Sequence, residues 1–191
     1  MQAAIDNNQS SAGMMAVIGL EAGQVESLIA DWKIDDLYAA NINSPKQVVV
    51  SGSLAALEEA EIRFKAAGAR RAVKLQVAGP FHSPLMKEAA DIFAPALEKI
   101  TFNNPVIPVF SNVTGKQIQS GEEAKALAVR QITESVRWTD IEAALAALQP
   151  DLLLETGPGK VLQGLWKDTG SEIPCHTAGS ITEINQLLEE E

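Results

Sequence analysis

The chain has 191 residues, of which 46% are hydrophobic and 21% charged, and its formal net charge is −10. This composition is typical of a globular protein with one domain or two small ones, and the negative charge disfavours binding to nucleic acid. No apolar run approaches the roughly 18 residues that span a bilayer, and the polar N-terminus lacks a secretion-signal pattern. The single cysteine, Cys175, is typical of a reducing compartment. We therefore expect a cytoplasmic protein without membrane contact.

The first part of the chain alternates short apolar runs with helical patterns. Residues 14–20, 37–42, 47–51 and 72–77 favour strands, and residues 24–32 and 53–67 have apolar side chains at helical spacing. Asn43, Ser44 and Pro45 indicate a turn between the two middle strands, and Gly68 ends the second helix. The predicted order is βαββαβ, a ferredoxin-like arrangement over residues 13–78.

The second part begins at Gly79 and reads as an α/β segment. Ser83 is placed to cap a helix that starts at Pro84, and Pro95 should kink or divide this helix. A capping box formed by Thr139 and Glu142 predicts a further helix. The remaining predictions are strands at residues 106–110 and 152–155 and helices at residues 122–132, 160–167 and 181–188. Two strands do not make an independent sheet, so residues 79–191 read as an incomplete larger domain.

Basic side chains cluster near the end of the ferredoxin-like part. Five of the 15 basic residues gather there, namely Arg63, Lys65, Arg70, Arg71 and Lys74. A solvated charged face is the preferred interpretation. A landing site for an acidic partner is the alternative.

His82 is the strongest candidate for chemistry. It lies in Gly79-Pro80-Phe81-His82-Ser83-Pro84, between a predicted strand and a predicted helix. Loops at the carboxyl edge of a parallel sheet form the sites of α/β proteins, and a neutral imidazole can act as a general base. From spacing alone, a hydrogen-bonded structural histidine is an equal alternative.

Other candidate motifs are weaker. Cys175 and His176 are adjacent, so their side chains diverge along an extended chain and a thiol–imidazole dyad is disfavoured. Residues 157–160 (GPGK) lack the glycine and hydroxyl residue of a phosphate loop at Leu154 and Val161, and indicate a tight turn instead. Free amide groups at the following helix start leave anion contact as a minor alternative. No group of His, Cys, Asp and Glu has metal-ligand spacing, so we expect neither a metal nor a cofactor.

The sequence contains no nucleophile elbow. None of its serines has glycine two residues before and two residues after it, the pattern that permits the strained turn exposing a serine. These residues therefore offer a base without an activated nucleophile.

Several stretches together resemble the malonyl-CoA:acyl-carrier-protein transacylases and the related acyltransferase domains of polyketide synthases. They follow the family's order from Gly13 to about Lys167, and comprise residues 41–45 (NINSP) with 47–52 (QVVVSG), 67–72 (AGARRA), 80–83 (PFHS) with 85–86 (LM), 110–113 (FSNV), 129–131 (VRQ) with 136–138 (VRW), and 155–162 (ETGPGKVL).

The resemblance implies a fold and a missing segment. In this family a ferredoxin-like small subdomain is inserted into an α/β-hydrolase-like large subdomain. Residues 1–12 would be the end of a large-subdomain helix or a linker, residues 13–78 the insertion, and residues 79–191 the C-terminal part of the large subdomain. The chain would begin just past the arginine that pairs with the malonyl carboxylate, and the serine elbow would lie upstream.

The resemblance also implies residue roles. Malonyl passes from coenzyme A to a serine and then to the phosphopantetheine thiol of acyl carrier protein. His82 matches the catalytic histidine, and Gln131 the residue whose backbone carbonyl orients the imidazole. Asn43 matches a residue facing the substrate cleft, and Phe81 the bulky residue of malonyl-selective members, in which the ring closes the space of an α-methyl group.

Plainer interpretations exist for three of these residues. Gln131 is otherwise a helix-surface amide, Asn43 a turn former and Phe81 a core side chain. At the level of the whole chain, the alternative to a transacylase whose N-terminal part is missing is a non-catalytic module that binds acyl carrier protein. The sequence does not separate these two functions.

Overall fold

The computed structural model describes residues 11–189 of a mixed α/β chain. The described residues form two compact units that divide between residues 141 and 142, and we describe them separately. Most of the predicted segment 1–12 lies outside the described residues, and Ala12 begins the first strand. A subdomain boundary between residues 78 and 79 remains a prediction.

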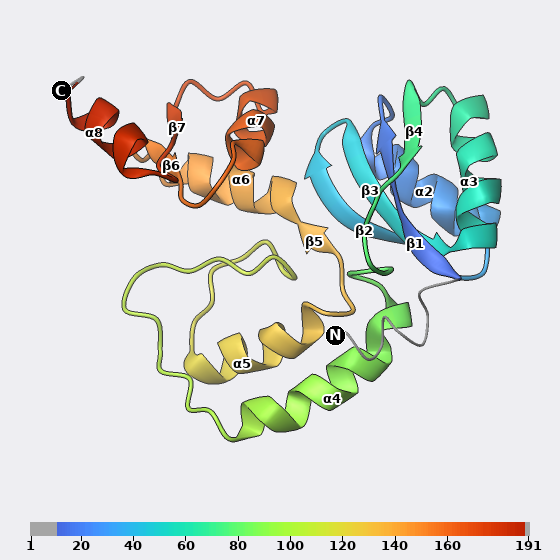
Figure 1. Ribbon diagram of the computed structural model, residues 1–191, viewed down its shortest axis with the longest axis horizontal. Helices are drawn as coiled ribbons and strands as arrows, with labels where there is room; N and C mark the ends of the chain where they lie inside the picture. Colours follow the sequence, from blue (N-terminus) through green and yellow to red (C-terminus); the bar gives the residue numbers. More distant parts are fainter. Residues whose placement is uncertain (1–10, 190–191) are drawn as a thin grey trace. The chain divides into compact units, whose positions relative to one another are not determined.

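The first unit is built on a five-stranded sheet with the strand order β4-β1-β3-β2-β5 (Figure 1). Its strands are β1 (Ala12–Ile18), β2 (Leu37–Ser44), β3 (Gln47–Ser53), β4 (Arg71–Lys74) and β5 (Val136–Arg137). Neighbouring strands are antiparallel except β2 and β5, which are parallel. The element order β1-α2-β2-β3-α3-β4 is the predicted βαββαβ order. Asn43 belongs to β2, so the predicted turn moves to Pro45 and Lys46.

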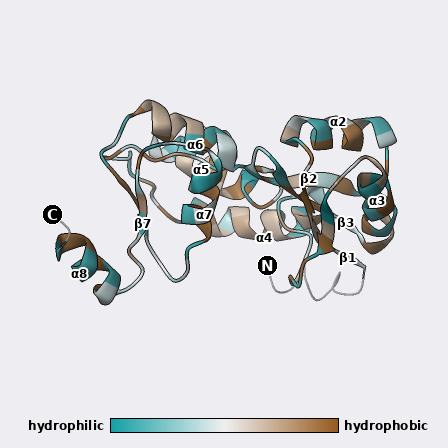
Figure 2. Cartoon of the chain, turned by 90° about the horizontal axis from the view of Figure 1, so that it is seen from above, coloured by the Kyte–Doolittle hydropathy of each residue, from teal (hydrophilic) through white to brown (hydrophobic). Residues whose placement is uncertain are grey.

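Helices α2 (Ala22–Trp32) and α3 (Leu54–Ala66) cover one face of this sheet. Alternate strand residues such as Val48 and Val50 point to that face, as the twofold period of a strand requires. Phe64 of α3 is fully buried, and its ring lies 4.7 Å from that of Trp32. Figure 2 shows the corresponding hydrophobic colouring along β3 and α3. Burial of these side chains is the main stabilising contribution to this unit.

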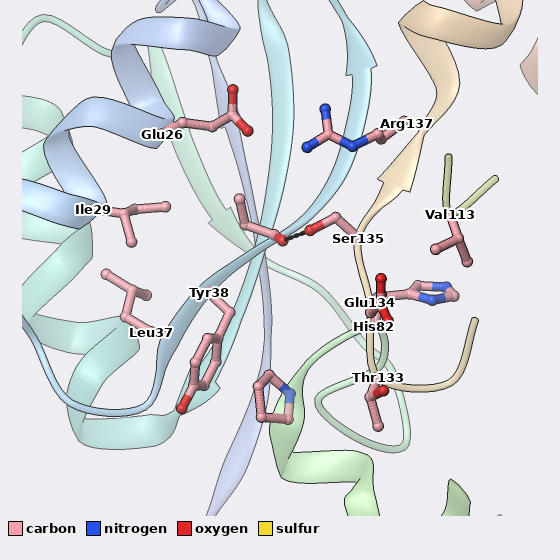
Figure 3. A pocket seen from close by; sticks show the side chains of 12 residues that line it. Glu26, Ile29, Leu37, Tyr38, His82, Val113, Thr133, Glu134, Ser135 and Arg137 are labelled. Carbon is pink, nitrogen blue, oxygen red and sulfur yellow. Dashed lines mark hydrogen bonds between the residues drawn. The ribbon is translucent and has the colours of Figure 1, made fainter. Parts of the chain in front are cut away.

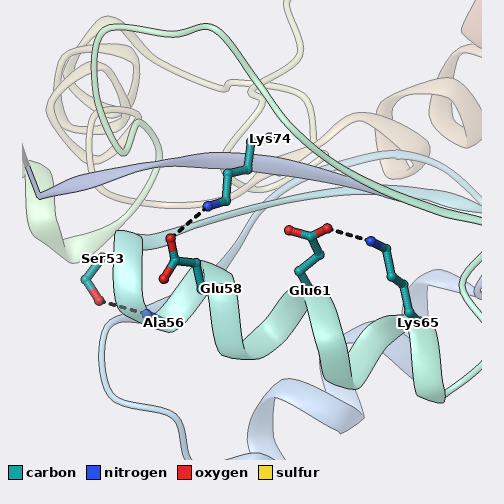
Figure 4. Close-up of polar contacts among 6 residues, drawn as sticks. All are labelled: Ser53, Ala56, Glu58, Glu61, Lys65 and Lys74. Carbon is teal, nitrogen blue, oxygen red and sulfur yellow. Dashed lines mark hydrogen bonds and ion pairs between the residues drawn. The ribbon is translucent and has the colours of Figure 1, made fainter.

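Helix α3 is capped at its N-terminus by Ser53, and Gly68 terminates it as predicted. The Ser53 hydroxyl accepts a hydrogen bond from the Ala56 amide (Figure 4). At the other end, the amides of Gly68 and Ala69 donate to the carbonyls of Lys65 and Phe64, which is a Schellman motif. Gly68 has a φ of 98°, a conformation that favours glycine.

The opposite face of the sheet carries a smaller apolar cluster. Met14, Ala16, Ala40 and Val49 are buried there, and Phe81 packs against them. Phe81 also contacts a third cluster around Met86 and Ala89. The loop that contains His82 is therefore anchored to the sheet through its neighbour in sequence.

The segment after this loop differs from the prediction in two respects. A short 3-10 helix, η1 (Pro84–Met86), precedes α4 (Lys87–Glu98), and the Ser83 hydroxyl donates to the Pro80 carbonyl rather than capping a helix. Pro95 lies within α4 without dividing it. Because Asp91 and Pro95 are both exposed, water can satisfy the carbonyl that loses its helical partner.

The predicted strand at residues 106–110 is wrong. Within the described residues this segment forms only an isolated bridge between Phe110 and Gln117. Pro105 and Pro108 lack amide donors, and Val106 is 98% exposed, so neither ladder hydrogen bonds nor burial favours a strand here. The chain continues through α5 (Gly121–Arg130), whose N-terminus is capped by Ser120.

The second unit contains a parallel strand pair. Its elements are β6 (Leu153–Glu155), α7 (Val161–Asp168), β7 (Cys175–Thr177) and α8 (Ile181–Glu189). Helix α6 (Trp138–Ala147) contains the division between the units. Because this helix begins at Trp138, Thr139 lies inside it, and the predicted capping box of Thr139 and Glu142 is wrong. No helix among residues 11–189 is long and apolar enough to cross a membrane.

We expect amide hydrogen exchange to be slowest in the central strand β3. Val48 and Val50 are fully buried between two paired strands, whereas Val106 is exposed and β6 pairs only with β7 in the described sheet. Strand amides protected by a packed core exchange through large-scale unfolding, and exposed segments exchange through local opening. Equal protection at residues 106–110 or 152–154, measured by NMR, would contradict this expectation.

Candidate active site

His82 is held in an unusual backbone conformation between β4 and η1. Its φ is 56°, in the left-handed region that non-glycine residues rarely occupy. The carbonyls of the two preceding residues, Pro80 and Phe81, accept hydrogen bonds from the hydroxyls of Ser83 and Ser51, each at 2.6 Å. The loop is thus fixed by side chains on both sides of the histidine.

The imidazole of His82 contacts the C-terminal end of α5. Its Nδ1 lies 2.8 Å from the backbone carbonyl oxygen of Gln131, the residue that follows the last residue of the helix. Carbonyls at a helix C-terminus have no partner within the helix and carry partial negative charge, so they are good acceptors. Since this oxygen can only accept, Nδ1 carries the proton and Nε2 has the free lone pair.

The Gln131 side chain makes a competing contact with the same ring atom. Its Nε2 lies 3.2 Å from Nδ1 of His82. An amide nitrogen can donate to Nδ1 only if that atom is unprotonated, so the two contacts exclude each other. The carbonyl contact is shorter by 0.4 Å, from 2.8 and 3.2 Å, and we take it as the hydrogen bond.

An ion pair between Arg130 and Glu134 spans the turn that contains Gln131. Arg130 donates twice to the carboxylate of Glu134, at 2.7 and 2.8 Å. The hydrogen bond from Arg130 holds the pKa of Glu134 below its usual value. Ser135 donates to the backbone carbonyl of Ala39 on β2, next to the point where β5 joins the sheet. These contacts tie the Gln131 carbonyl to the same sheet that anchors the His82 loop.

An open pocket of about 400 Å³ adjoins His82 (Figure 3). Its polar lining includes Tyr38, Ser135 and Arg137, and Arg137 lies 3.5 Å from Asp140. Partial burial, followed by the nearby Asp36 carboxylate, raises the pKa of the Tyr38 phenol. Tyr38, Ser135 and Arg137 are not among the predicted site residues. The two-residue strand β5, which brings Ser135 and Arg137 next to β2, has no recognisable period.

Asn43 and Phe81 occupy different surroundings. Neither lines this pocket among the described residues. Asn43 is half-buried in β2, and Phe81 is half-buried between two apolar clusters. The structure therefore brings His82 and Gln131 together, whereas the assignment of Asn43 and Phe81 to a substrate cleft remains a prediction.

The weaker motifs do not form sites. Burial, followed by the Glu155 and Glu142 carboxylates, raises the pKa of the Cys175 thiol, which disfavours a nucleophilic thiolate. At the start of α7 the amides of Leu162 and Gln163 donate to the Glu155 carboxylate, so these two groups are already occupied by an anion from the chain itself. Among residues 11–189 no cluster of His, Cys, Asp and Glu could hold a metal ion.

Known proteins resemble the chain over nearly its whole length. A curated malonyl CoA-acyl carrier protein transacylase from Synechocystis sp. is 37% identical over 179 residues, which make up 93% of this chain and 59% of that protein. Solved structures are similar to this chain as well, including the following two. An acyl carrier protein S-malonyltransferase from Vibrio cholerae has a TM-score of 0.88 at 35% identity, over 94% of this chain and 59% of that one. A malonyl-transacylase in complex with a type II polyketide synthase acyl-carrier protein has a TM-score of 0.91 at 34% identity, over 99% and 62%.

The chain thus spans about three fifths of the length of these relatives. The family model of the acyl transferase domain matches residues 4–186, which include the His82 loop, α5 and β5. With this match covering most of the sequence, the chain belongs to the acyl transferase domain family.

Proposed function

We propose that this chain takes part in malonyl transfer from coenzyme A to the phosphopantetheine thiol of acyl carrier protein, with His82 as the general base. The observation that carries the proposal is the contact of 2.8 Å between Nδ1 of His82 and the Gln131 carbonyl, because it leaves Nε2 free to accept a proton. The names of the relatives support the substrate class. We further infer that the βαββαβ unit is the family's ferredoxin-like subdomain, and that residues 79–191 belong to its hydrolase-like subdomain.

The proposed reaction has two matched steps. Nε2 of His82 removes the proton of a serine hydroxyl as its oxygen attacks the malonyl thioester carbonyl, and the sulfur–carbon bond to coenzyme A breaks. The imidazolium returns the proton to the departing thiolate. In the second step His82 deprotonates the phosphopantetheine thiol, which attacks the malonyl ester, and the serine leaves with its proton restored. The Gln131 carbonyl stabilises the imidazolium in both steps, as the acid of a hydrolase triad does.

Substrate selection is assigned to Asn43 and Phe81 as part of the same proposal. A phenylalanine before the histidine would close the space that an α-methyl group needs. A difference of one methyl group is worth only about 1–3 kcal/mol of discrimination. Phe81 also packs in two apolar clusters, so a substitution here would have to be checked for stability before its selectivity is interpreted.

The basic cluster is a candidate contact for an acidic partner, and acyl carrier protein is the partner proposed here. Arg63, Lys65 and Lys74 form ion pairs with acidic residues of α3, which favours the solvated face for these three. Within the described part of the chain, Arg70 and Arg71 are exposed and form no ion pair. These two arginines are therefore the better candidates for an acidic partner.

We expect a polypeptide of these 191 residues to show no malonyl transfer by itself. It has a proposed base, but its sequence offers no serine in a nucleophile elbow. The measurement is transfer of radiolabelled malonyl from malonyl-CoA to acyl carrier protein. Turnover above background that disappears in His82→Ala would refute the expectation, because it would require a nucleophile within this chain.

A second candidate function is a non-catalytic module that binds acyl carrier protein, which needs no nucleophile within this chain. Titration of the chain with acyl carrier protein, followed by NMR, distinguishes the two. Saturable binding that weakens in Arg70→Ala and Arg71→Ala, together with no transfer after an N-terminal fragment of a full-length relative is added, would favour the binding module.

A further inference from the structure

Ser51 is a buried hydroxyl that contacts the His82 loop. It lies in β3, its residue is fully buried, and its Oγ donates to the Phe81 carbonyl at 2.6 Å. In β3 it is two residues from Val49 and therefore on the same face of the sheet, the face against which Phe81 packs. The hydrogen bond crosses 30 residues of sequence.

The accepting carbonyl belongs to the peptide bond that leads into His82. The φ angle of His82 is the rotation of its Cα substituents relative to this peptide plane. At 56° this angle is unfavourable for a residue with a Cβ, and such conformations persist only where the surroundings determine them. The Ser51 hydroxyl holds the carbonyl of this peptide, and the Gln131 carbonyl holds the imidazole of His82 at Nδ1.

We propose that Ser51 is a positioning residue for His82. By holding the Phe81–His82 peptide, it keeps the histidine in the left-handed conformation in which Nδ1–H reaches the Gln131 carbonyl. The use of this tautomer by a general base rests on the proposed function. The tautomer itself is a property of this chain and can be measured without any reaction. The Gln131 carbonyl determines which ring nitrogen carries the proton, and the buried Ser51 hydroxyl keeps the ring within reach of that carbonyl.

The test is the tautomer of His82 in the 191-residue chain. Long-range proton–nitrogen correlation spectra of nitrogen-15 histidine-labelled protein distinguish Nδ1–H from Nε2–H, at a pH where the imidazole is neutral. The chain has only two histidines, and His176→Gln assigns their signals. In Ser51→Ala, the loss of one hydrogen bond should lower the ratio of Nδ1–H to Nε2–H about fivefold.

Matched variants separate positioning from general stability. Ser44→Ala removes another buried serine of the same sheet, on β2, and should leave the ratio unchanged. Ser51→Cys has nearly the same shape but a weaker donor, and should give an intermediate ratio. A wild-type ratio in folded Ser51→Ala would overturn the proposal. Should Ser51→Ala fail to fold, a wild-type ratio in Ser51→Cys would overturn it, and a reduced ratio would support it. No substrate is involved, so the result is independent of acyl transfer.

Discussion

Replacing His82 by alanine is expected to lower malonyl transfer by roughly 10⁴-fold in a complex that is otherwise active, because a general base contributes up to about this factor. The active complex would be made by adding an N-terminal fragment of a full-length relative that ends at its malonyl-binding arginine. This fragment would supply the serine, and its strands would cover apolar side chains that are exposed here, namely Val106, Val109, Leu152 and Leu154. The measurement is radiolabelled malonyl transfer by the paired chains.

Gln131→Ala is the matched control for this experiment. The hydrogen bond to His82 is accepted by the backbone carbonyl of residue 131, which the substitution retains, so transfer should fall much less than in His82→Ala. Full activity of the His82→Ala pair would contradict the assignment of the base. Association of the two chains without any transfer would instead favour the binding module.

The elements of the first unit could be predicted because local signals and packing agree there. Gly68 is the left-handed C-terminal residue of α3, as predicted, and the helix begins directly after Ser53, where the helical pattern starts. The apolar periodicity of β3 and α3 corresponds to their buried faces. His82 could be found from its motif and from the order of the surrounding segments. Its contact with Gln131 joins residues 49 positions apart, and only the resemblance to a family indicated it.

The sequence-based predictions fail where long-range contacts, rather than local sequence, determine the structure. Val106 and its neighbours have the composition of a strand, but without a paired strand they remain exposed. Conversely, β5 has two residues and becomes a strand only by pairing with Asn41 and Ile42 of β2. Ser83 has the residue type of a helix cap, yet its hydroxyl is taken by the Pro80 carbonyl. The hydrogen bond between Ser51 and the Phe81 carbonyl could not be predicted for the same reason, because nothing in the local sequence of either residue indicates the other.

Phe64→Ala is expected to destabilise the first unit by about 3–5 kcal/mol, the usual cost of removing a fully buried phenylalanine ring. Phe64 is 0% exposed and contacts Trp32, so the substitution leaves a cavity between α3, α2 and the sheet. The best measurement is the free energy of opening from native-state hydrogen exchange at the amides of Val48 and Val50. It reports on this unit alone, whereas global denaturation would mix the two units of the chain.

Phe93→Ala is the matched control, because it removes the same ring from a residue of α4 that is 37% exposed. Less apolar area is returned to water there and no closed cavity forms, so the opening free energy at Val48 and Val50 should change by less than about 1 kcal/mol. Similar losses in both variants would mean that the ring of Phe64 is not the centre of this core. A large loss confined to Phe64→Ala would also predict a looser His82 loop, since β3 carries the Ser51 hydroxyl that binds the Phe81 carbonyl. The tautomer ratio of His82 should then fall in Phe64→Ala under conditions where β3 opens, and remain at the wild-type value in Phe93→Ala.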